Sequence, residues 1–262
     1  FGTFPSTDDD SHYAVSAWNL SLAESKGLDL MVECGSCYSS LQTGREHIVG
    51  HESVKTRVNE LLEPVGRSYD GKAKVRHITD ILYNEVGLDT IKKNVKKSLE
   101  GLHGVVQYPC HTLFPSEVVG FDSPPGRPHI LRELVEALGA EVDHFSREYQ
   151  CCGGAGGFHN TSALEAQDYS KTKLDAIRNE TKADFIVVSC ITCLMHLDNV
   201  QKELSHGNGE YNIPVFDYNQ ILALCMGYDA NEVAPIYSVP RESITSRFGY
   251  GNDRRQRFVV AV

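Results

Sequence analysis

The sequence predicts an α/β fold of two similar lobes, each with a short parallel sheet and flanking helices. Three observations predict it. Short apolar runs alternate with segments of helical periodicity along the 262-residue chain. Residues 27–37 match residues 183–193, and both segments end in Cys-x-x-Cys, which indicates an internal repeat. Cys34, Cys110 and Cys190 each follow a predicted strand, at the edge where open α/β sheets form their sites.

The first half begins with a predicted helix over residues 12–26, which Gly27 is placed to end. A buried strand is expected over residues 28–32, and helices near residues 54–62 and 78–86. Apolar side chains recur at roughly helical spacing in the first helix: Tyr13, Val15, Trp18 and Leu22.

In the second half, strands are predicted over three segments: residues 104–108, 142–145 and 184–188. A helix over residues 130–138 has Pro128 near its start and Gly139 at its end, where helix-terminal signals belong. Another helix is expected over about residues 162–179. Strands and helices that alternate in this way favour parallel sheets.

We expect three parts in the chain. Residues 1–100 form the C-terminal part of a first domain, residues 101–228 a complete second domain, and residues 229–262 a C-terminal arm. The first lobe is expected to be incomplete, because cysteines at the second-half spacings before Cys34 would fall upstream of Phe1. The polar arm, with Arg254-Arg255-Gln256-Arg257, is predicted to dock on a partner protein; a frayed tail is the alternative.

Composition excludes several classes of function. A formal net charge of −10 and scattered basic residues argue against nucleic-acid binding. No apolar run approaches the length of a membrane span, so any membrane link would go through a partner. The opening residues, which lack a basic n-region and an apolar h-region, are not expected to be a signal peptide. Its eight cysteines suit metal binding in a reducing compartment better than disulfides, and we expect a cytoplasmic protein.

The main chemical motif is a set of five cysteines in the second half: Cys110, Cys151, Cys152, Cys190 and Cys193. Five thiolates from three loops exceed the four that tetrahedral zinc or a cubane cluster normally takes. The side chains of adjacent cysteines usually point apart, which also favours a multinuclear metal cluster over a single metal ion. The sequence therefore predicts one multinuclear iron–sulfur cluster and a redox enzyme.

Two further features extend this hypothesis. Cys34 and Cys37, at the equivalent place in the first half, are expected to be part of a second cluster site. Gly153 and Gly154 belong to a glycine-rich loop over residues 151–157. Because this loop has few side chains, we expect it to enclose an inorganic cluster and to direct backbone N–H groups toward sulfides. The helix that follows is expected to add its positive N-terminal end.

His111 follows Cys110 directly and is a candidate proton donor to a leaving thiolate. A hydrogen bond to a sulfide, or a packed core histidine, are the favoured alternatives. His159 and His196 lie near the other cysteine loops and are expected to be structural. Cys225 lies in an apolar helix and is expected to be a core thiol.

Two other sites remain open alternatives. A structural zinc site would use both Cys-x-x-Cys pairs, but it leaves the other three second-half cysteines without a role. A thiol–disulfide exchange enzyme would use one such pair, and it ignores the glycine loop. The zinc ligands would be Cys34, Cys37, Cys190 and Cys193.

Three runs resemble the cysteine-rich CCG-domain family, and within it the B subunits of heterodisulfide reductase from methanogenic archaea. They are Tyr-Pro-Cys-His-Thr-Leu-Phe-Pro (108–115), Cys-Cys-Gly-Gly-Ala-Gly-Gly (151–157) and Ser-Cys-Ile-Thr-Cys-Leu-Met-His-Leu-Asp (189–198). The resemblance covers about residues 1–230. It implies two Rossmann-like CCG lobes and two noncubane 4Fe–4S clusters in the full-length protein. Five second-half cysteines would bind one cluster, and Cys34 and Cys37 would contribute to the other.

The resemblance also implies a function. It implies reduction of the mixed disulfide of coenzyme M and coenzyme B to two thiols, in methanogenesis. Implied partners are a C-type iron–sulfur subunit and a flavin-bearing, electron-bifurcating A-type subunit, with hydrogenase or formate dehydrogenase further out. The nearest alternative is an electron-relay subunit of another CCG oxidoreductase, of the glycolate or lactate oxidase or thiol:fumarate reductase type. A zinc-stabilised binding subunit is the alternative outside enzymes.

Overall fold

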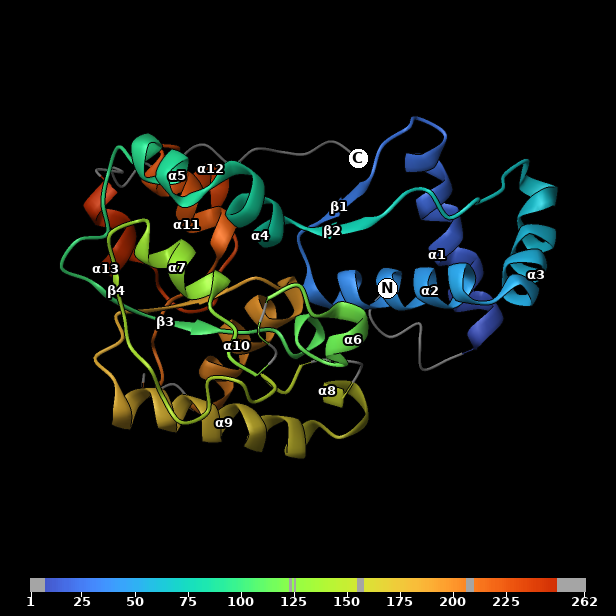
Figure 1. Cartoon of the computed structure of the whole chain (residues 1–262). Coiled ribbons are helices and arrows are strands. Elements are labelled where there is room, and N and C mark those ends of the chain that lie inside the picture. The colour runs from blue at the N-terminus through green and yellow to red at the C-terminus, as the bar shows by residue number, and fades with distance from the viewer. Residues whose placement is uncertain (1–7, 123, 125, 155–157, 206–209, 249–262) are drawn as a thin grey trace.

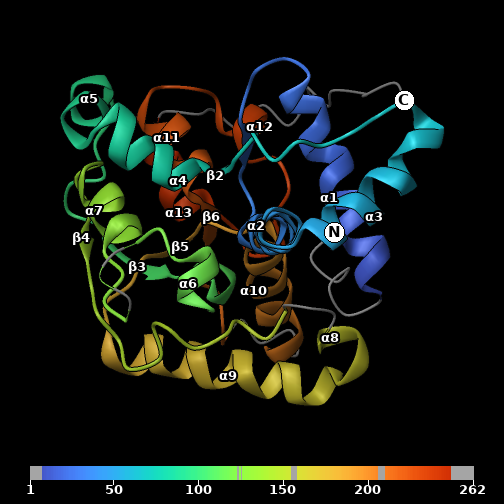
Figure 2. The same ribbon diagram turned by 45° about the vertical axis from the view of Figure 1, so that its right-hand side comes forward.

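The computed structural model describes residues 8–122, 124, 126–154, 158–205 and 210–248. These residues form two α/β lobes that lie side by side (Figure 1). Figure 2, turned by 45°, shows the helix α2 end-on between the two lobes. The predicted class, two lobes with short parallel sheets and flanking helices, is confirmed.

The first lobe holds a two-stranded parallel sheet and its helices. Its elements in chain order are α1 (Asp9–Glu24), β1 (Leu30–Val32), α2 (Gly35–Gly50), α3 (Glu52–Leu62), the 3₁₀ turn η2 (Glu63–Val65) and β2 (Val75–His77).

Helix α1 begins earlier than predicted and buries a different face. Asp8 caps it, because its carboxylate accepts the Ser11 N–H at 2.8 Å. Gly27 ends it as predicted, with φ of +66°. The apolar stripe predicted from spacing is wrong: Ala17 and Leu20 are fully buried, whereas the predicted stripe includes Trp18, which is 44% exposed. Small residues face the core here because α2 packs closely against α1.

Strand β1 is shorter and more exposed than the predicted buried strand. It pairs with β2 in parallel, Leu30 opposite Val75 and Val32 opposite His77. Met31 is 49% exposed. Among the described residues β1 has a neighbour on one edge, so the burial expected of an inner strand does not develop.

The second lobe and the segments packed on it contain the remaining elements. They are α4 (Ile78–Ile81), the π-helical turn η3 (Leu82–Val86), α5 (Leu88–Asn94), β3 (His103–Gln107), the 3₁₀ turn η4 (Cys110–Thr112), α6 (Ser116–Val119), α7 (Ile130–Glu136), β4 (Glu141–Val142), α8 (Phe158–Thr161), α9 (Ala163–Glu180), β5 (Phe185–Val188), α10 (Ile191–Leu204), β6 (Val215–Asp217), α11 (Tyr218–Cys225), α12 (Ala230–Val233), α13 (Glu242–Thr245) and the 3₁₀ turn η6 (Ser246–Phe248).

Four parallel strands form the second sheet in the order β4-β3-β5-β6. The chain leaves β3 toward β4 on one side, then crosses back to place β5 on the other side of β3. This reversal creates a topological switch point between β3 and β5, and ligands bind outside the carboxyl ends of the strands at such a point. Cys110 follows β3 and Cys190 follows β5.

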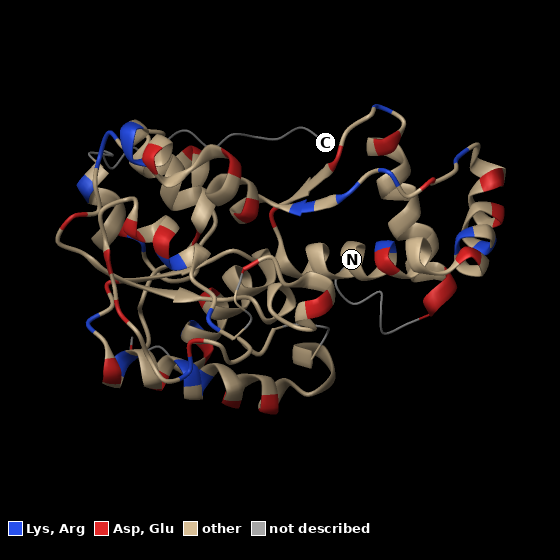
Figure 3. Cartoon of the chain, viewed as in Figure 1, with Lys and Arg blue, Asp and Glu red and all other residues tan. Residues whose placement is uncertain are grey.

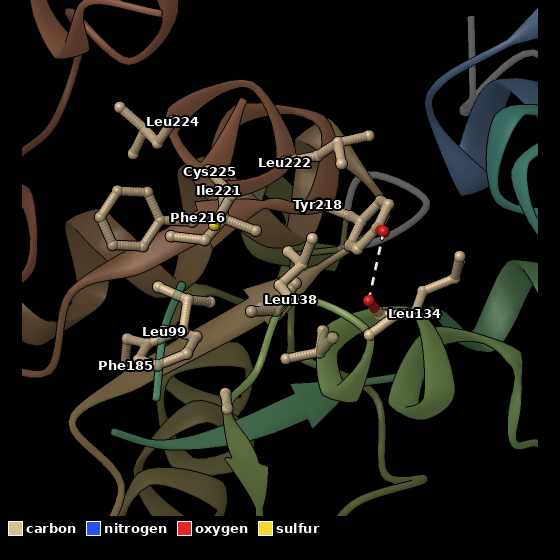
Figure 4. Packing of buried hydrophobic residues seen from close by; sticks show 14 of the residues in the cluster. Leu99, Leu134, Leu138, Phe185, Phe216, Tyr218, Ile221, Leu222, Leu224 and Cys225 are labelled. Carbon is tan, nitrogen blue, oxygen red and sulfur yellow. Dashed lines mark hydrogen bonds between the residues drawn. The ribbon is translucent and has the colours of Figure 1, made fainter. Parts of the chain in front are cut away.

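Helices cover both faces of this sheet. Phe185 and Val187 face one core, shared with α7 and α11, whereas Ile186 and Val188 face the other, shared with α9 and α10. Figure 4 shows the first core, where the Tyr218 hydroxyl donates to the Leu134 carbonyl at 3.2 Å. All four strand residues are fully buried, and this double burial explains the continuous apolar run.

The proposed boundary between residues 100 and 101 stays a prediction. Ile91 and Leu99, which precede it, lie in the core of the second lobe. In the arm, Val239, Ile244 and Phe248 are buried. The arm therefore packs on its own chain as far as residue 248, while Arg254-Arg255-Gln256-Arg257 lies outside the described residues and its docking on a partner stays a prediction.

Acidic and basic residues, coloured along the ribbon in Figure 3, are interspersed over both lobes. They form no single-sign stripe in this view, in keeping with the scattered basic residues of the sequence. In the part of the chain that the structure describes, no helix combines the length and apolar character that a membrane span needs.

Candidate cysteine-rich redox site

The cysteines lie where strands end and helices begin. Cys34 is the N-cap residue of α2 and Cys190 that of α10, so each sulfur lies at a helix N-terminus. From the sequence, we expect a positive helix N-terminus beside the site only from the helix after the glycine loop. The sequence does not identify α2 and α10, whose N-termini carry Cys34 and Cys190. Cys110 lies in η4, and Cys151 and Cys152 lie in the loop between β4 and α8.

Seven cysteines form one continuous series of thiol contacts. The central contact joins the lobes, with the Cys34 and Cys190 sulfurs 3.6 Å apart. The remaining thiols follow one another closely enough to shift each other's pKa. The order is Cys37, Cys34, Cys190, Cys193, Cys152, Cys151 and Cys110. All five cysteines predicted for one cluster are thus together, and the two from the first lobe adjoin them.

Neighbouring thiols and burial raise the pKa of some of these cysteines, and neighbouring thiols lower that of another. Contact with Cys151, together with burial, raises the pKa of Cys152 to about 12. The same causes place the pKa of Cys110 well above its usual range. Hydrogen bonds from Cys190 and Cys37 hold the pKa of Cys34 far below the ordinary value. One thiolate is thus stabilised by its neighbours, and the others must lose protons before they bind metal.

Gly153 and Gly154 aim their backbone N–H groups at sulfur. The Gly153 N–H donates to Cys151 and the Gly154 N–H to Cys152, both at 3.4 Å. Gly153 has φ of +97°, and a Cβ atom on Gly154 would lie 2.6 Å from the Cβ of His196. Both positions therefore need glycine. Residues 155–157 of the predicted loop lie outside the described residues.

Two polar residues fix this loop from behind. The Ser170 hydroxyl lies 2.8 Å from the Cys152 carbonyl oxygen and 2.8 Å from Nε2 of His196. Burial lowers the pKa of His196 to about 4, so its imidazole is neutral at pH 7. His196 therefore packs as a structural residue against the glycine loop, as the sequence suggests.

A histidine from the first lobe braces the second cysteine loop. His77, at the end of β2, is fully buried. Its Nε2 lies 3.1 Å from the carbonyl oxygen of Ser189, the residue before Cys190. Gly35 brings the lobes close as well, since a Cβ there would lie 2.9 Å from the Cβ of Pro109. The Cys110 and Cys190 loops are thus both held by the first lobe.

His111 lies beside Cys110 in η4, and its Nδ1 is buried with no hydrogen-bond partner among the described residues. Nδ1 of His159 is in the same situation. Buried ring nitrogens normally have partners. An acceptor or donor supplied by a bound group at the cysteines would satisfy them, and the proton-donor role of His111 stays a prediction.

A hollow of about 700 Å³ opens beside the first-lobe end of the cysteine series. Cys34 and Cys37 line it, together with polar side chains from α10 and α8. Among these are Thr192, Asn199 and His159. A small molecule in this hollow would reach sulfur directly.

The donor set fits a multinuclear iron–sulfur group. Sulfurs extend in a series, and in the described residues no group of three or more His, Cys, Asp or Glu has the arrangement for a single metal ion. The Cys34–Cys190 contact does bring both Cys-x-x-Cys pairs together, as the zinc alternative requires. The series nevertheless continues through Cys152 and Cys151 to Cys110, which that alternative leaves without a role. Cys225 is a buried core thiol, as predicted.

Several supporting residues were missed by the sequence analysis. Ser170 and Lys173 lie on the buried face of α9 with Ala166, Leu174 and Ile177. Polar residues on an apolar helical stripe are a usable signal, because buried Lys is rare unless it has a purpose. His77 gave no such signal, because its partner Ser189 is 112 positions away in sequence.

Comparisons with known proteins agree with this site. A family model described as a cysteine-rich domain, CCG, matches residues 105–198. A protein of Archaeoglobus profundus, named as like the B subunit of heterodisulfide reductase, is 42% identical over 94% of this chain and 83% of its own length. The B subunit of the ferredoxin/F420H2-dependent CoB-CoM heterodisulfide reductase of Methanosarcina acetivorans is 33% identical over 88% of this chain and 77% of its own.

Two more distant relatives widen the comparison. The 8-methylmenaquinol:fumarate reductase membrane anchor subunit of Wolinella succinogenes is 29% identical over 86% of this chain and 77% of its own length. The crystal structure of a hypothetical protein from Helicobacter pylori has a TM-score of 0.65 over 88% of this chain, at 14% identity. The chain spans 42% of that protein, and the likeness shows the fold alone.

Proposed function

This chain belongs to the family of heterodisulfide reductase B subunits, and on that premise we propose that it reduces the heterodisulfide of coenzyme M and coenzyme B to two thiols. The reaction consumes two electrons and two protons per disulfide. The single observation that carries the proposal is the unbroken series of seven cysteine sulfurs at the switch point of the second sheet.

We propose that the five second-lobe cysteines hold a noncubane 4Fe–4S cluster and that Cys34 and Cys37 contribute to a second one. Burial supports the first assignment, since Cys152, Cys190 and Cys193 are each at most 4% exposed. When bound, such clusters supply electrons one at a time and iron that can take up a thiolate.

The chain's own residues bind and orient the substrate and move protons in this proposal. The hollow beside Cys34 and Cys37 admits the disulfide to the boundary between the lobes. The N–H groups of Gly153 and Gly154 hold the thiolates of Cys151 and Cys152, in the same loop, in place. His111, which follows Cys110 in η4, would deliver a proton to a departing thiolate.

Membership of a subunit family implies a multi-subunit complex. We propose a C-type iron–sulfur subunit as the direct electron donor, supplied in turn by a flavin-bearing, electron-bifurcating A-type subunit, with hydrogenase or formate dehydrogenase further out. A cytoplasmic location likewise stays a prediction.

The decisive experiment uses the complete protein, reconstituted with iron and sulfide without oxygen. We expect iron and acid-labile sulfide in equal amounts, and oxidation of a reduced viologen dye on addition of the heterodisulfide, with two thiols formed per disulfide. Bound zinc without labile sulfide would refute the proposal. The heterodisulfide is also expected to change the electron paramagnetic resonance signal of the iron.

A second candidate function is electron relay in another oxidoreductase. The relative from Wolinella succinogenes, named as part of a fumarate reductase, is the observation that favours it. An iron signal that ignores the heterodisulfide, together with no viologen oxidation, would select this relay function over disulfide reduction.

A further inference from the structure

Lys173 is a buried cation that forms no ion pair with a carboxylate among the described residues. It lies in α9, the long helix along the lower side of the second lobe in Figure 1, and its side chain is fully buried. Its Nζ donates to the carbonyl oxygens of Arg147 and Glu148 and lies 5.2 Å from the centroid of the Phe145 ring. These contacts solvate the ammonium group but do not neutralise its charge.

The carboxylate of Glu148, whose backbone oxygen Lys173 contacts, is already paired with two other side chains. The Glu148 carboxylate is 2.7 Å from the guanidinium of Arg132 and 3.0 Å from Nδ1 of His144. Lys173 meets only the backbone oxygen of Glu148. Pairing with Glu148 therefore does not explain why an ammonium group is buried here.

The cysteine series is the other source of negative charge beside this helix. Ser170, one turn before Lys173 in α9, lies 2.8 Å from the carbonyl oxygen of Cys152, so this helix directly backs the Cys152 loop. Burial lowers the pKa of Lys173 to about 8; attraction to Cys152, Cys193 and Cys151 when these are thiolates, and to the Glu148 carboxylate, acts in the opposite direction. The lysine thus remains mostly protonated at pH 7.

We propose that Lys173 is the counter-charge of the cysteine site: its buried ammonium offsets the negative charge of the thiolates and their iron–sulfur group, and so raises the group's reduction potential. The inference rests on the proposed function. Removing an isolated ammonium from water is costly. That cost is compensated when anionic thiolates gather nearby, and each added electron strengthens the attraction.

The test uses two variants of the complete protein, each with Lys173 replaced by a different neutral residue. Lys173→Met keeps length and apolar packing, and Lys173→Gln keeps a donor for the two carbonyl oxygens. The matched control is Lys171→Met, because Lys171 is two residues away on the same helix, half-exposed, and paired with Asp175 at 2.6 Å. Dye-mediated redox titration followed by electron paramagnetic resonance gives the midpoint potential without substrate.

We expect both Lys173 variants to shift the midpoint potential to more negative values, and the Lys171 control to leave it unchanged. In the iron-free protein, Lys173→Met is expected to unfold at the same or a higher urea concentration than the unsubstituted chain, because a desolvated charge is gone. A residue needed only for packing would give the reverse pattern, with reduced stability and an unmoved potential.

An unmoved potential in a Lys173→Gln protein that holds its iron refutes the inference and leaves the proposed function intact. Absence of iron and labile sulfide from the unsubstituted protein refutes the proposed function, and the inference with it. Should Lys173→Met fail to fold, Lys173→Gln alone decides.

Discussion

The two lobes have the same strand–cysteine–helix unit in different surroundings. Leu30 pairs with Val75 in the first lobe, and the equivalent Ile186 pairs with Val215 in the second. The strand of the second lobe is buried on both faces, whereas β1 is partly exposed. Local sequence therefore sets the unit, and the number of neighbouring strands sets how much of it is buried.

The lobes differ again directly after the first cysteine of each Cys-x-x-Cys. Gly35 follows Cys34, and its missing side chain lets α2 approach Pro109 in the other lobe. Ile191 follows Cys190 and is 38% exposed at the edge of the hollow. One copy of the motif is thus adapted to close packing between lobes, and the other borders an accessible space.

The largest expected effect separates the cysteines of the two lobes. Cys190→Ser should remove the iron and labile sulfide of the second-lobe cluster after reconstitution, because a serine hydroxyl is a poor substitute for a soft thiolate ligand. Cys34→Ser should retain the cluster of the second lobe, since Cys34 is not among its five proposed ligands. Both are measured as iron and sulfide per chain.

Cys225→Ser is the matched control, because Cys225 is equally buried in the second lobe but lies in the apolar core. It should keep its iron. Loss of all bound iron in both Cys190→Ser and Cys34→Ser would contradict the two-site assignment and favour one shared site held by both Cys-x-x-Cys pairs.

A smaller effect concerns the two equivalent strands. Ile186→Ala is expected to lower the free energy of unfolding by about 3 kcal/mol, because it opens a cavity in a fully buried strand. Leu30→Ala, at the equivalent place in β1, should cost roughly 1 kcal/mol, since Leu30 is only partly buried. Urea unfolding of the iron-free protein measures both; equal losses would show that β1 is as well packed as β5.

A third comparison concerns the residues that cap the helices after β2 and β6. The His77 ring accepts the Thr79 N–H, and Asp217 accepts the Asn219 N–H. Burial lowers the pKa of His77 to about 4 and raises that of Asp217 to about 7. Asp217 therefore keeps its proton in the folded state between pH 4 and 7 while the unfolded chain loses it, so its contribution to stability falls as pH rises through this range.

His77 gives the opposite slope: it stays neutral in the folded state down to about pH 4, and its contribution is lost as pH falls from about 6.5 to 4. Asp217→Asn should preserve the helix cap and remove only the fall in stability with rising pH that Asp217 causes. Urea unfolding of the iron-free proteins at pH 4.5 and pH 7 measures this. Between these two pH values, the free energy of unfolding should change more favourably in the variant than in the unsubstituted protein. Parallel pH profiles would show that Asp217 ionises normally.

Sequence alone determined the α/β class, the internal repeat and the five cysteines of the second lobe. These depend on short-range patterns: apolar runs, glycine placement and cysteine spacing. The repeat extends to strand pairing, because Val75 lies opposite Leu30 as Val215 lies opposite Ile186, although the sequence predicted no strand at Val75 or Val215.

Only the tertiary structure decided which face of α1 is buried, how exposed Met31 is, and that Cys34 contacts Cys190 across 156 positions of sequence. It also placed His77 on the Ser189 carbonyl and buried Lys173 behind the cysteine loops. The physical reason is common to all of them. Burial and charge compensation depend on which distant segments meet, and no local periodicity encodes those contacts.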